Sequence, residues 1–149
     1  MVCLGNICRS PIAEGLLKHK AKQHGLDWTV ASAGMIANPG QTPHRFSQKI
    51  CFSRGINISS QGARKFRPEM LQEYDKIYAM SEDVMEEILK VAEEGMDTSH
   101  VGLLLNESAP GRNDSVPDPI NGPEPWFVIV YDMVNTACDA IINNYKDKQ

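Results

Sequence analysis

The run CLGNICRSP, from Cys3 to Pro11, combines residue types that can bind and attack a phosphate. A loop that leads straight into a helix exposes backbone N–H groups at the positive end of the helix dipole, and these groups form a cradle for an anion. Gly5 and Asn6 suit such a loop because both tolerate the left-handed backbone conformation. Arg9 adds a planar guanidinium that can hold two phosphate oxygens. The run therefore predicts a phosphate site.

Cys3 lies at the base of this predicted cradle, where the helix terminus and the Arg9 guanidinium favour the thiolate over the thiol. A thiolate that faces a bound phosphoryl group can attack it in line and form a phosphocysteine intermediate. Ser10 can donate a hydrogen bond to the thiolate and help it leave in the second step. A nucleotide-binding Walker loop is excluded, because no Gly-Lys-Ser/Thr ends the loop. The expected substrate-binding residues are Leu4, Gly5, Asn6, Ile7, Cys8 and Ser10.

A second stretch, SVPDPINGPEP, supplies a candidate general acid. Asp118 stands between two prolines, which stiffen the loop on both sides. Such a loop can hold a carboxyl group over the cradle, where it would give a proton to the leaving group. An aspartate in a proline-rich loop is often only a turn residue. Paired with the cysteine loop, Asp118 is predicted to be catalytic.

The elements that must position these residues alternate between two hydrophobic periods. Short apolar runs bounded by turn residues predict strands, and repeats of three to four residues predict helices. Strand alternating with helix favours a three-layer α/β/α fold, a four-stranded parallel sheet with helices on both faces. The loop after the first strand then lies at the carboxyl end of the sheet, where ligands bind. The predicted strands are 1–4, 29–33, 76–80 and 101–105, and the predicted helices are 11–24, 43–54, 82–94 and 124–145.

Several helix ends have a predicted cause. Ser10 is expected to cap the first helix, with Pro11 at its first position. Gly25 and Gly95 follow helical runs, where a left-handed residue commonly ends a helix.

Length and charge limit the classes of function. The chain has 149 residues, which predicts one domain over 1–149, and a net charge of -4 with a pI near 5.5 argues against a nucleic-acid binder. No apolar run approaches the roughly 18 to 20 residues of a membrane span, and no signal-peptide profile is present. We expect a cytoplasmic protein that binds neither nucleic acid nor membrane. Its four cysteines lack zinc-site spacing, which predicts free thiols, no metal and no cofactor.

Together these residues resemble the low-molecular-weight protein tyrosine phosphatase family. The loop pattern of that family is matched from Cys3 to Pro11, the Asp-Pro of its acid loop at Asp118, and a Ser-Ala-Gly at Ser32, and the order of elements fits over essentially the whole chain. The resemblance implies a phosphotyrosine phosphatase I-like fold and hydrolysis of phosphotyrosine in a protein, or of a small aryl phosphate. The sequence does not indicate the oligomeric state, and we expect a monomer. The resemblance implies Cys3 as nucleophile, Arg9 as phosphate clamp and Asp118 as general acid and base. It also implies that Asn6, Ser10 and Ser32 form a network that supports the loop.

Departures from the family pattern qualify these expectations. Ser60 stands where a histidine that supports the loop is common in the family, so one support of the loop is changed. Ser81 stands where an aspartate often orients the arginine. We therefore expect Arg9 to be held less firmly, or to be held by Glu82 or Asp83 instead. The acid loop lacks the family's aromatic residues, because Ile120 and Asn121 follow Pro119, so regulation by tyrosine phosphorylation there is not expected. Met35 and Ile36 are then the best candidates for a pocket wall, and Trp126 is a weaker one. All three can equally be packing residues.

Two further expectations concern Cys8 and the start of the chain. Cys8 is either a buried packing residue or, as the resemblance implies, a thiol that traps oxidised Cys3 in a reversible disulfide. Only Met1 and Val2 precede Cys3, whereas relatives usually have several apolar residues there. We expect that the numbered chain begins inside the natural protein.

Two other functions stay open. Thiol-dependent arsenate reduction uses a similar loop, but it needs cysteines close together late in the chain, whereas Cys51 and Cys138 are isolated. A phosphate-recognising module without turnover is the other alternative, and the presence of Asp118 argues against it, because a binder needs no general acid.

Overall fold

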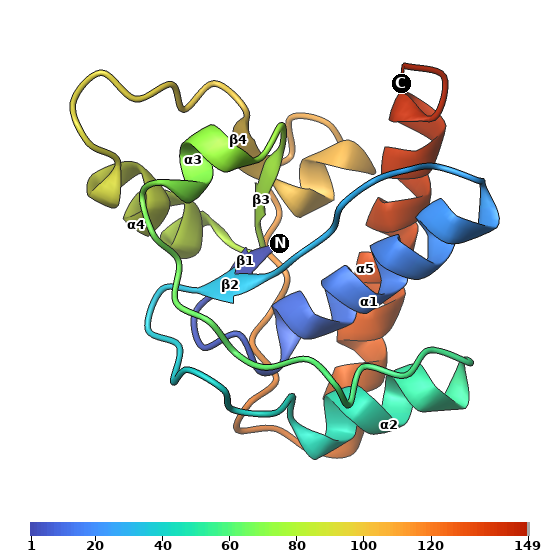
Figure 1. Ribbon diagram of the computed structural model, residues 1–149. Coiled ribbons are helices and arrows are strands. Elements are labelled where there is room, and N and C mark those ends of the chain that lie inside the picture. The colour runs from blue at the N-terminus through green and yellow to red at the C-terminus, as the bar shows by residue number, and fades with distance from the viewer. Residues whose placement is uncertain (149) are drawn as a thin grey trace.

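A parallel sheet forms the centre of the molecule, with helices on both of its faces (Figure 1). The coordinates are a computed structural model, which describes residues 1–148. The strand order β2-β1-β3-β4 confirms the predicted four-stranded parallel sheet. The strands are β1 (Val2–Cys3), β2 (Ala33–Gly34), β3 (Ile77–Ala79) and β4 (Val101–Leu103).

The helices divide between the two faces of the sheet. Figure 1 shows α1, α2 and α5 on one side and α3 and α4 on the other. The helix bounds are α1 (Arg9–Gln23), α2 (Arg45–Ser53), α3 (Met70–Glu73), α4 (Glu82–Val91) and α5 (Glu124–Tyr145), and a 3-10 helix, η1 (Leu104–Glu107), follows β4.

Side chains of the central strands alternate between two hydrophobic cores. Val2 and Ala79 pack with α3 and α4, whereas Cys3, Tyr78 and Met80 pack with α1 and α5. This alternation follows from the period of two in a strand, and burial on both faces explains why these strands are continuously apolar. Cys3 therefore enters the core on the side of α1.

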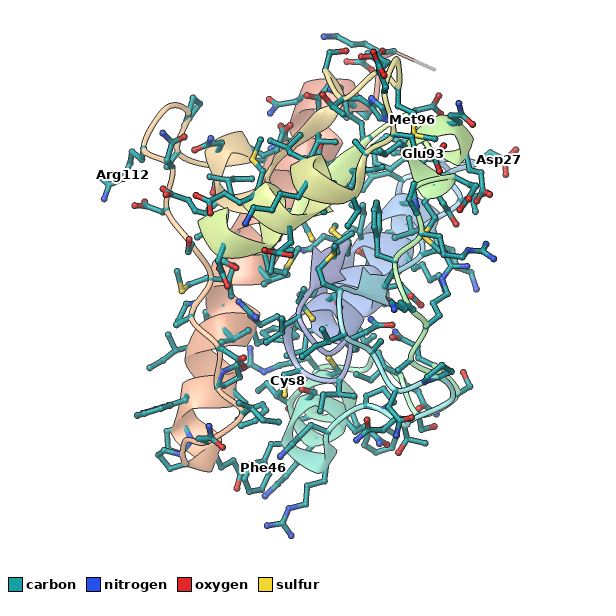
Figure 2. All side chains as sticks on the ribbon, turned by 90° about the vertical axis from the view of Figure 1, so that its left-hand side faces the viewer. Cys8, Asp27, Phe46, Glu93, Met96 and Arg112 are labelled. Atoms are coloured by element: carbon teal, nitrogen blue, oxygen red, sulfur yellow. The ribbon has the colours of Figure 1, made fainter. Side chains whose placement is uncertain are left out.

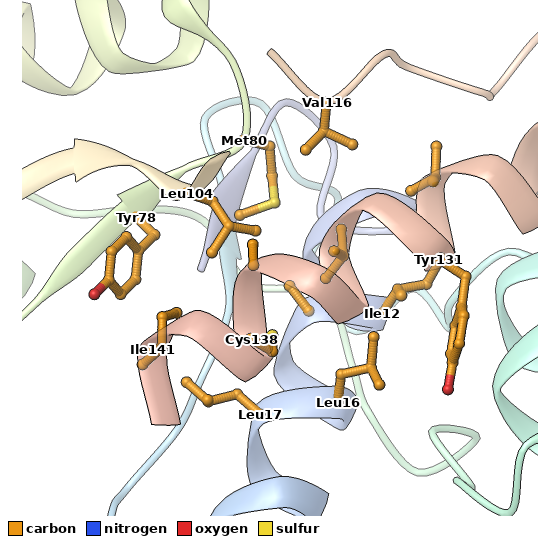
Figure 3. Packing of buried hydrophobic residues seen from close by; sticks show 14 of the residues in the cluster. Ile12, Leu16, Leu17, Tyr78, Met80, Leu104, Val116, Tyr131, Cys138 and Ile141 are labelled. Carbon is orange, nitrogen blue, oxygen red and sulfur yellow. The ribbon is translucent and has the colours of Figure 1, made fainter. Parts of the chain in front are cut away.

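The core on that side is built around α5. Figure 3 shows side chains from β3 and η1, such as Tyr78 and Leu104, and from α1, such as Leu16, in the same core as Cys138 of α5. By length and composition α5 could cross a membrane, which the sequence analysis missed. One face of the helix is buried in this core, as in the central helix of many proteins.

The structure corrects several predicted boundaries. Residues 29–32 make no ladder, because β1 offers only two residues for pairing with β2, and the further bridge of β2 joins Gly34 to Lys65. The first helix begins at Arg9, so Pro11 is not its first residue, and Ser10 does not cap it because its hydroxyl bonds to side chains of the preceding loop. Gly25 has the predicted positive φ after α1, whereas α4 ends at Val91, before Gly95.

A hollow lies away from the cysteine loop. It has a volume of about 700 Å³, and its lining includes Val30, Ala31, Lys76 and Ile77, which lie at the amino ends of the strands. Cys3 ends β1 at the opposite, carboxyl edge of the sheet, where the predicted site residues meet.

Candidate active site

The loop between β1 and α1 carries the predicted nucleophile at one end and the predicted clamp at the other. Cys3 is the last residue of β1 and is 2% exposed, and Arg9 is the first residue of α1 and is 5% exposed. The loop residues 4–8 therefore stand directly before a helix of 15 residues. The free N–H groups of its first turn and its dipole favour an anion at this position.

Asn6 determines the shape of the loop. Its φ is +57°, in the left-handed region, and its backbone N–H donates to Cys3 Sγ at 3.3 Å. Its side-chain Nδ2 donates to Ser10 Oγ at 2.8 Å and to Ser32 Oγ at 2.9 Å, while its Oδ1 accepts from the backbone N–H of Arg64 at 3.0 Å. These contacts offset the cost of about 1 to 2 kcal/mol for a left-handed residue. Asn6, Ser10 and Ser32 thus lie in one network, as the sequence analysis expected.

Gly34, rather than Gly5, is the glycine that the loop geometry requires. Gly5 has no positive φ, contrary to the expectation, and a Cβ there would meet only Ile7 Cγ1 at 3.7 Å. A Cβ on Gly34 would lie 2.7 Å from the carbonyl oxygen of Leu4 and 2.8 Å from the backbone nitrogen of Asn6. Since both neighbours are backbone atoms, β2 can approach the loop only without a side chain at residue 34.

Ser10 lies beside the sulfur of Cys3, at 2.9 Å between Oγ and Sγ. Either atom can donate in this contact. When the hydroxyl donates, it stabilises negative charge on the sulfur. This position suits the predicted assistance by Ser10 to thiolate departure.

Three oxygen-bearing groups surround the Arg9 guanidinium. Nη1 donates to Ser81 Oγ at 3.3 Å and to the carbonyl oxygen of Val116 at 3.1 Å, and Nη2 lies 3.5 Å from Asp118 Oδ2. Ser81 is itself buried. The arginine is thus held by Ser81 directly, which the sequence analysis did not expect.

Asp83 interacts with this cluster through Ser81. A hydrogen bond from the Ser81 hydroxyl is the main cause that lowers the pKa of Asp83, and the charge of Arg9 contributes in the same direction. Of the two acidic residues that were expected to replace an aspartate at 81, Asp83 has this link. Glu82 uses its backbone N–H, which donates to Ser115 Oγ at 3.0 Å.

Asp118 lies near Arg9 on a loop that is more exposed than the cysteine loop. Its side chain is 38% exposed, and its Oδ1 accepts from the backbone N–H of Ile120 at 3.2 Å. The loop is anchored at Val116, whose backbone N–H donates to the carbonyl oxygen of Met80 at 2.8 Å. The structure therefore brings Cys3, Arg9 and Asp118 to one end of the sheet.

The three candidate wall residues differ in their exposure and in their distance from the cysteine loop along the chain. The backbone N–H groups of Met35 and Ile36 donate to the carbonyl oxygens of Cys3 and Leu4 at 3.1 and 2.9 Å, so this segment runs beside the cysteine loop. Ile36 is 69% exposed, whereas Met35 packs partly against the core. Trp126 lies against Gly122 in the acid loop and is half exposed. Ile36 is the most accessible of the three.

Position 60, where the sequence analysis expected a changed loop support, lies at the surface. Ser60 is exposed, and its neighbour Ser59 bonds to Asn57. The segment supports the loop from Arg64, whose backbone N–H holds Asn6, and Gln61 donates to the carbonyl oxygen of Pro11 at 3.1 Å.

Cys8 is buried, and its surroundings favour the thiol over the thiolate. Burial raises its pKa to about 12. Figure 2 shows it on the loop above α2, where Ser47 Oγ donates to its carbonyl oxygen at 3.1 Å. Cys51 and Cys138 are also buried, and burial raises the pKa of each to about 12. Within residues 1–148 no three His, Cys, Asp or Glu side chains are grouped so that they could hold a metal ion.

Sequence reasoning missed the contacts of Glu14 and of the backbone of Arg64, and it noted Gly34 only as part of the Ser-Ala-Gly that matches the family pattern. Glu14 had a local signal, because it is the one acidic residue in the apolar run IAEGLL of the first helix. The Arg64 backbone had none, because its contact with Asn6 joins segments that are far apart in the chain.

Comparison with known proteins places the whole chain in one group. The family model described as "Low molecular weight phosphotyrosine protein phosphatase" matches residues 1–149. The low molecular weight protein-tyrosine-phosphatase YfkJ of Bacillus subtilis is 33% identical over 99% of this chain and 96% of its own, and its crystal structure superposes with a TM-score of 0.90. PtpA of Staphylococcus aureus, another protein with that description, is 34% identical over 95% of this chain and 89% of its own.

A third similar protein is described as a phosphatase of a different kind. The arginine phosphatase YwlE superposes with a TM-score of 0.91 and 25% identity, over 99% of this chain and 95% of its own. The structure compared is that of a mutant with serine in place of a cysteine and with a phosphorylated active-site serine.

Proposed function

The chain belongs to the low molecular weight phosphotyrosine protein phosphatase family and is a phosphatase, and we propose that it hydrolyses phosphotyrosine and small aryl phosphates through a phosphocysteine intermediate. The observation that carries this proposal is the meeting of three groups at the carboxyl end of β1. Cys3 and Arg9 bracket one anion-binding loop, and Asp118 lies 3.5 Å from Arg9.

In the first step the Cys3 thiolate attacks phosphorus. An S–P bond forms while the bond between phosphorus and the aryl oxygen breaks, and Asp118 gives its proton to the leaving oxygen. Arg9 and the N–H groups of the loop bind the equatorial oxygens, whose charge is spread in the transition state.

In the second step water attacks the phosphocysteine. The S–P bond breaks, Asp118 takes the proton from the water, and inorganic phosphate leaves. Ser10 donates to the departing thiolate from 2.9 Å. The phosphorylated serine in the YwlE mutant supports a covalent phosphoenzyme in a similar fold.

Substrate choice depends on the mouth of the site. Ile36 and the half-exposed Leu4 offer apolar surface on which an aryl ring can lie. An aryl phosphate also reaches further from a deep loop than the short phosphoserine side chain. Phosphotyrosine therefore suits this site better than phosphoserine does.

Cys8 is proposed to protect oxidised Cys3. Peroxide oxidises the Cys3 thiolate to the sulfenic acid, and the Cys8 sulfur then forms a disulfide with Cys3 as water is lost. The high pKa of Cys8 makes its thiolate scarce, so this second step should be slow near neutral pH.

One set of assays tests the function. Turnover of a phosphotyrosine peptide is compared with that of phosphoserine and phosphoarginine peptides, in the parent and in Cys3→Ser, before and after peroxide. We expect turnover of the phosphotyrosine peptide alone and its loss in Cys3→Ser. Full activity in Cys3→Ser would refute the mechanism, faster phosphoarginine turnover would change the substrate, and tight phosphopeptide binding without turnover would favour the binding module.

A further inference from the structure

Glu14 is a buried carboxylate that none of the proposed steps uses. It lies on α1, beyond the cysteine loop, and is 7% exposed. Its Oε1 accepts from the Ser32 hydroxyl at 2.7 Å, and its Oε2 accepts from Lys18 Nζ at 2.8 Å. Burying a carboxylate is unfavourable unless its oxygens are hydrogen-bonded, and here both are. Its contact with Ser32 connects it to the network around Asn6.

The donors of this network fix the orientation of the Asn6 amide and of the Ser32 hydroxyl. The backbone N–H of Arg64 can only donate, so it must face Asn6 Oδ1, and Asn6 Nδ2 must then donate to Ser10 and Ser32. An ionised carboxylate can only accept, so the Ser32 proton points to Glu14. Because the oxygen of Ser10 is occupied as an acceptor from Asn6, its own proton is free for Cys3 Sγ at 2.9 Å.

We propose that Glu14 is a positioning residue, which accepts the Ser32 proton and thereby keeps Asn6 and Ser10 oriented as donors toward the Cys3 thiolate. The proposal rests on the proposed role of Cys3 as nucleophile. Without an acceptor at residue 14, the Ser32 hydroxyl turns its proton toward the hydrogen-bond partners of the Asn6 side chain and disturbs them. Asn6 depends on these partners because its backbone has the left-handed conformation. Asn6 then orients its own N–H toward the sulfur less firmly.

The charge of Glu14 and its role as an acceptor have opposite effects on Cys3. A nearby anion opposes formation of the thiolate, so removing the charge alone would favour the thiolate. Removing the acceptor loosens the two donors that face the sulfur, which disfavours the thiolate. The direction of the change in a variant therefore shows which effect controls the site.

The test compares Glu14→Met with Glu14→Gln in the full chain. Activity on p-nitrophenyl phosphate is measured together with the pH dependence of Cys3 alkylation by iodoacetamide. Glu14→Met has no oxygen at this position, and we expect kcat/KM to fall about tenfold and the midpoint of alkylation to rise by about one pH unit. Glu14→Gln keeps one oxygen for Ser32, so most of the activity returns and the midpoint does not rise. If Glu14→Met matches the parent, or Glu14→Gln is as impaired as Glu14→Met, the proposal is wrong.

A double-mutant cycle with Ser32→Ala tests the route. Because Glu14 acts through Ser32, Ser32→Ala should reproduce the loss, and the pair Glu14→Met with Ser32→Ala should lose no more than either alone. Lys18→Met is the matched control, because it removes the ion pair of Glu14 and keeps the Ser32 bond, and it should change kcat/KM less than about twofold. Thermal unfolding of each variant verifies folding. If Glu14→Met does not fold, normal kinetics and alkylation in Ser32→Ala overturn the proposal. Activity in Cys3→Ser would refute the proposed function instead.

Discussion

The two loops that meet at Arg9 are held in different ways. The cysteine loop is buried, and Asn6 alone bonds to Cys3, Ser10, Ser32 and Arg64. The acid loop is stiffened by prolines, and Asp118 keeps a side chain that is 38% exposed and contacts Arg9 at 3.5 Å. The proposed nucleophile and clamp are thus held in place by buried contacts, whereas the proposed acid lies at the surface. An acid that protonates different leaving groups must reach oxygens in different positions, whereas a loop that binds phosphate needs a constant shape.

The largest expected effect comes from removing the acid. Asp118→Ala should lower kcat by about 10²–10⁴-fold on phenyl phosphate, because the leaving oxygen then departs without a proton. The loss should be much smaller on p-nitrophenyl phosphate, whose leaving group is stable as an anion. Steady-state kinetics on the two substrates provide the measurement. Equal losses on both would mean that Asp118 acts by another route.

The next effect comes from filling the space between β2 and the cysteine loop. Gly34→Ala places a Cβ against backbone atoms of Leu4 and Asn6, so the loop must move, and we expect a loss of about 1–3 kcal/mol in unfolding free energy together with lower activity. Gly5→Ala is the matched control for stability, because its Cβ meets only Ile7 Cγ1 at 3.7 Å. Urea unfolding compares the two. Equal destabilisation would contradict the assignment of the tight contact to Gly34.

A smaller effect is expected at the far side of Arg9. Asp83→Asn removes the charge that acts on Arg9 through Ser81, so the substrate should bind less tightly and KM should rise. The rise should be only about two- to fivefold, because Asp83 is exposed. Glu82→Gln, in the same turn, is the control and should not change KM. Adding Ser81→Asp to Asp83→Asn supplies a direct carboxylate and should restore KM. If KM is not restored in this double variant, Asp83 does not act on substrate binding through Arg9.

The smallest effect is on stability in acid. The pKa of Asp83 lies below its usual 3.8, so its ionised form is favoured in the folded state. That contribution is present above pH 3.8 and is lost as pH falls through the lowered pKa. The stability difference between the parent and Asp83→Asn should therefore shrink from pH 6 to pH 3 in urea titrations. A constant difference would show that the hydrogen bond with Ser81 does not favour the charged form.

Local patterns predicted the four strands, the four longer helices and the residues of the two loops, but not the short helices α3 and η1. The bounds of α5 match the predicted 124–145, because its apolar repeat is long and uninterrupted. The strands are shorter than predicted, because pairing depends on how many residues the neighbouring strand supplies. The sequence indicated Cys3, Arg9 and Asp118 because each stands in a local motif.

What the sequence could not reveal depends on which segments become neighbours. The requirement for glycine at Gly34 arises from the approach of β2 to the loop, and no periodicity encodes that distance. Ser10 has the residue type and position of a helix cap, but its hydroxyl bonds instead to Cys3 and Asn6. Support from Arg64 comes from its backbone, so its residue type carried no signal.

Because Val2 and Cys3 point into different cores, the proposed catalysis by Cys3 depends on the register of β1. A one-residue insertion in β1 would exchange the faces and turn the position of the sulfur toward α3 and α4, even if the sheet still paired. An insertion or deletion in β1 therefore disturbs both the packing of the two cores and the position of the sulfur. Loops at the molecular surface can change length without either effect.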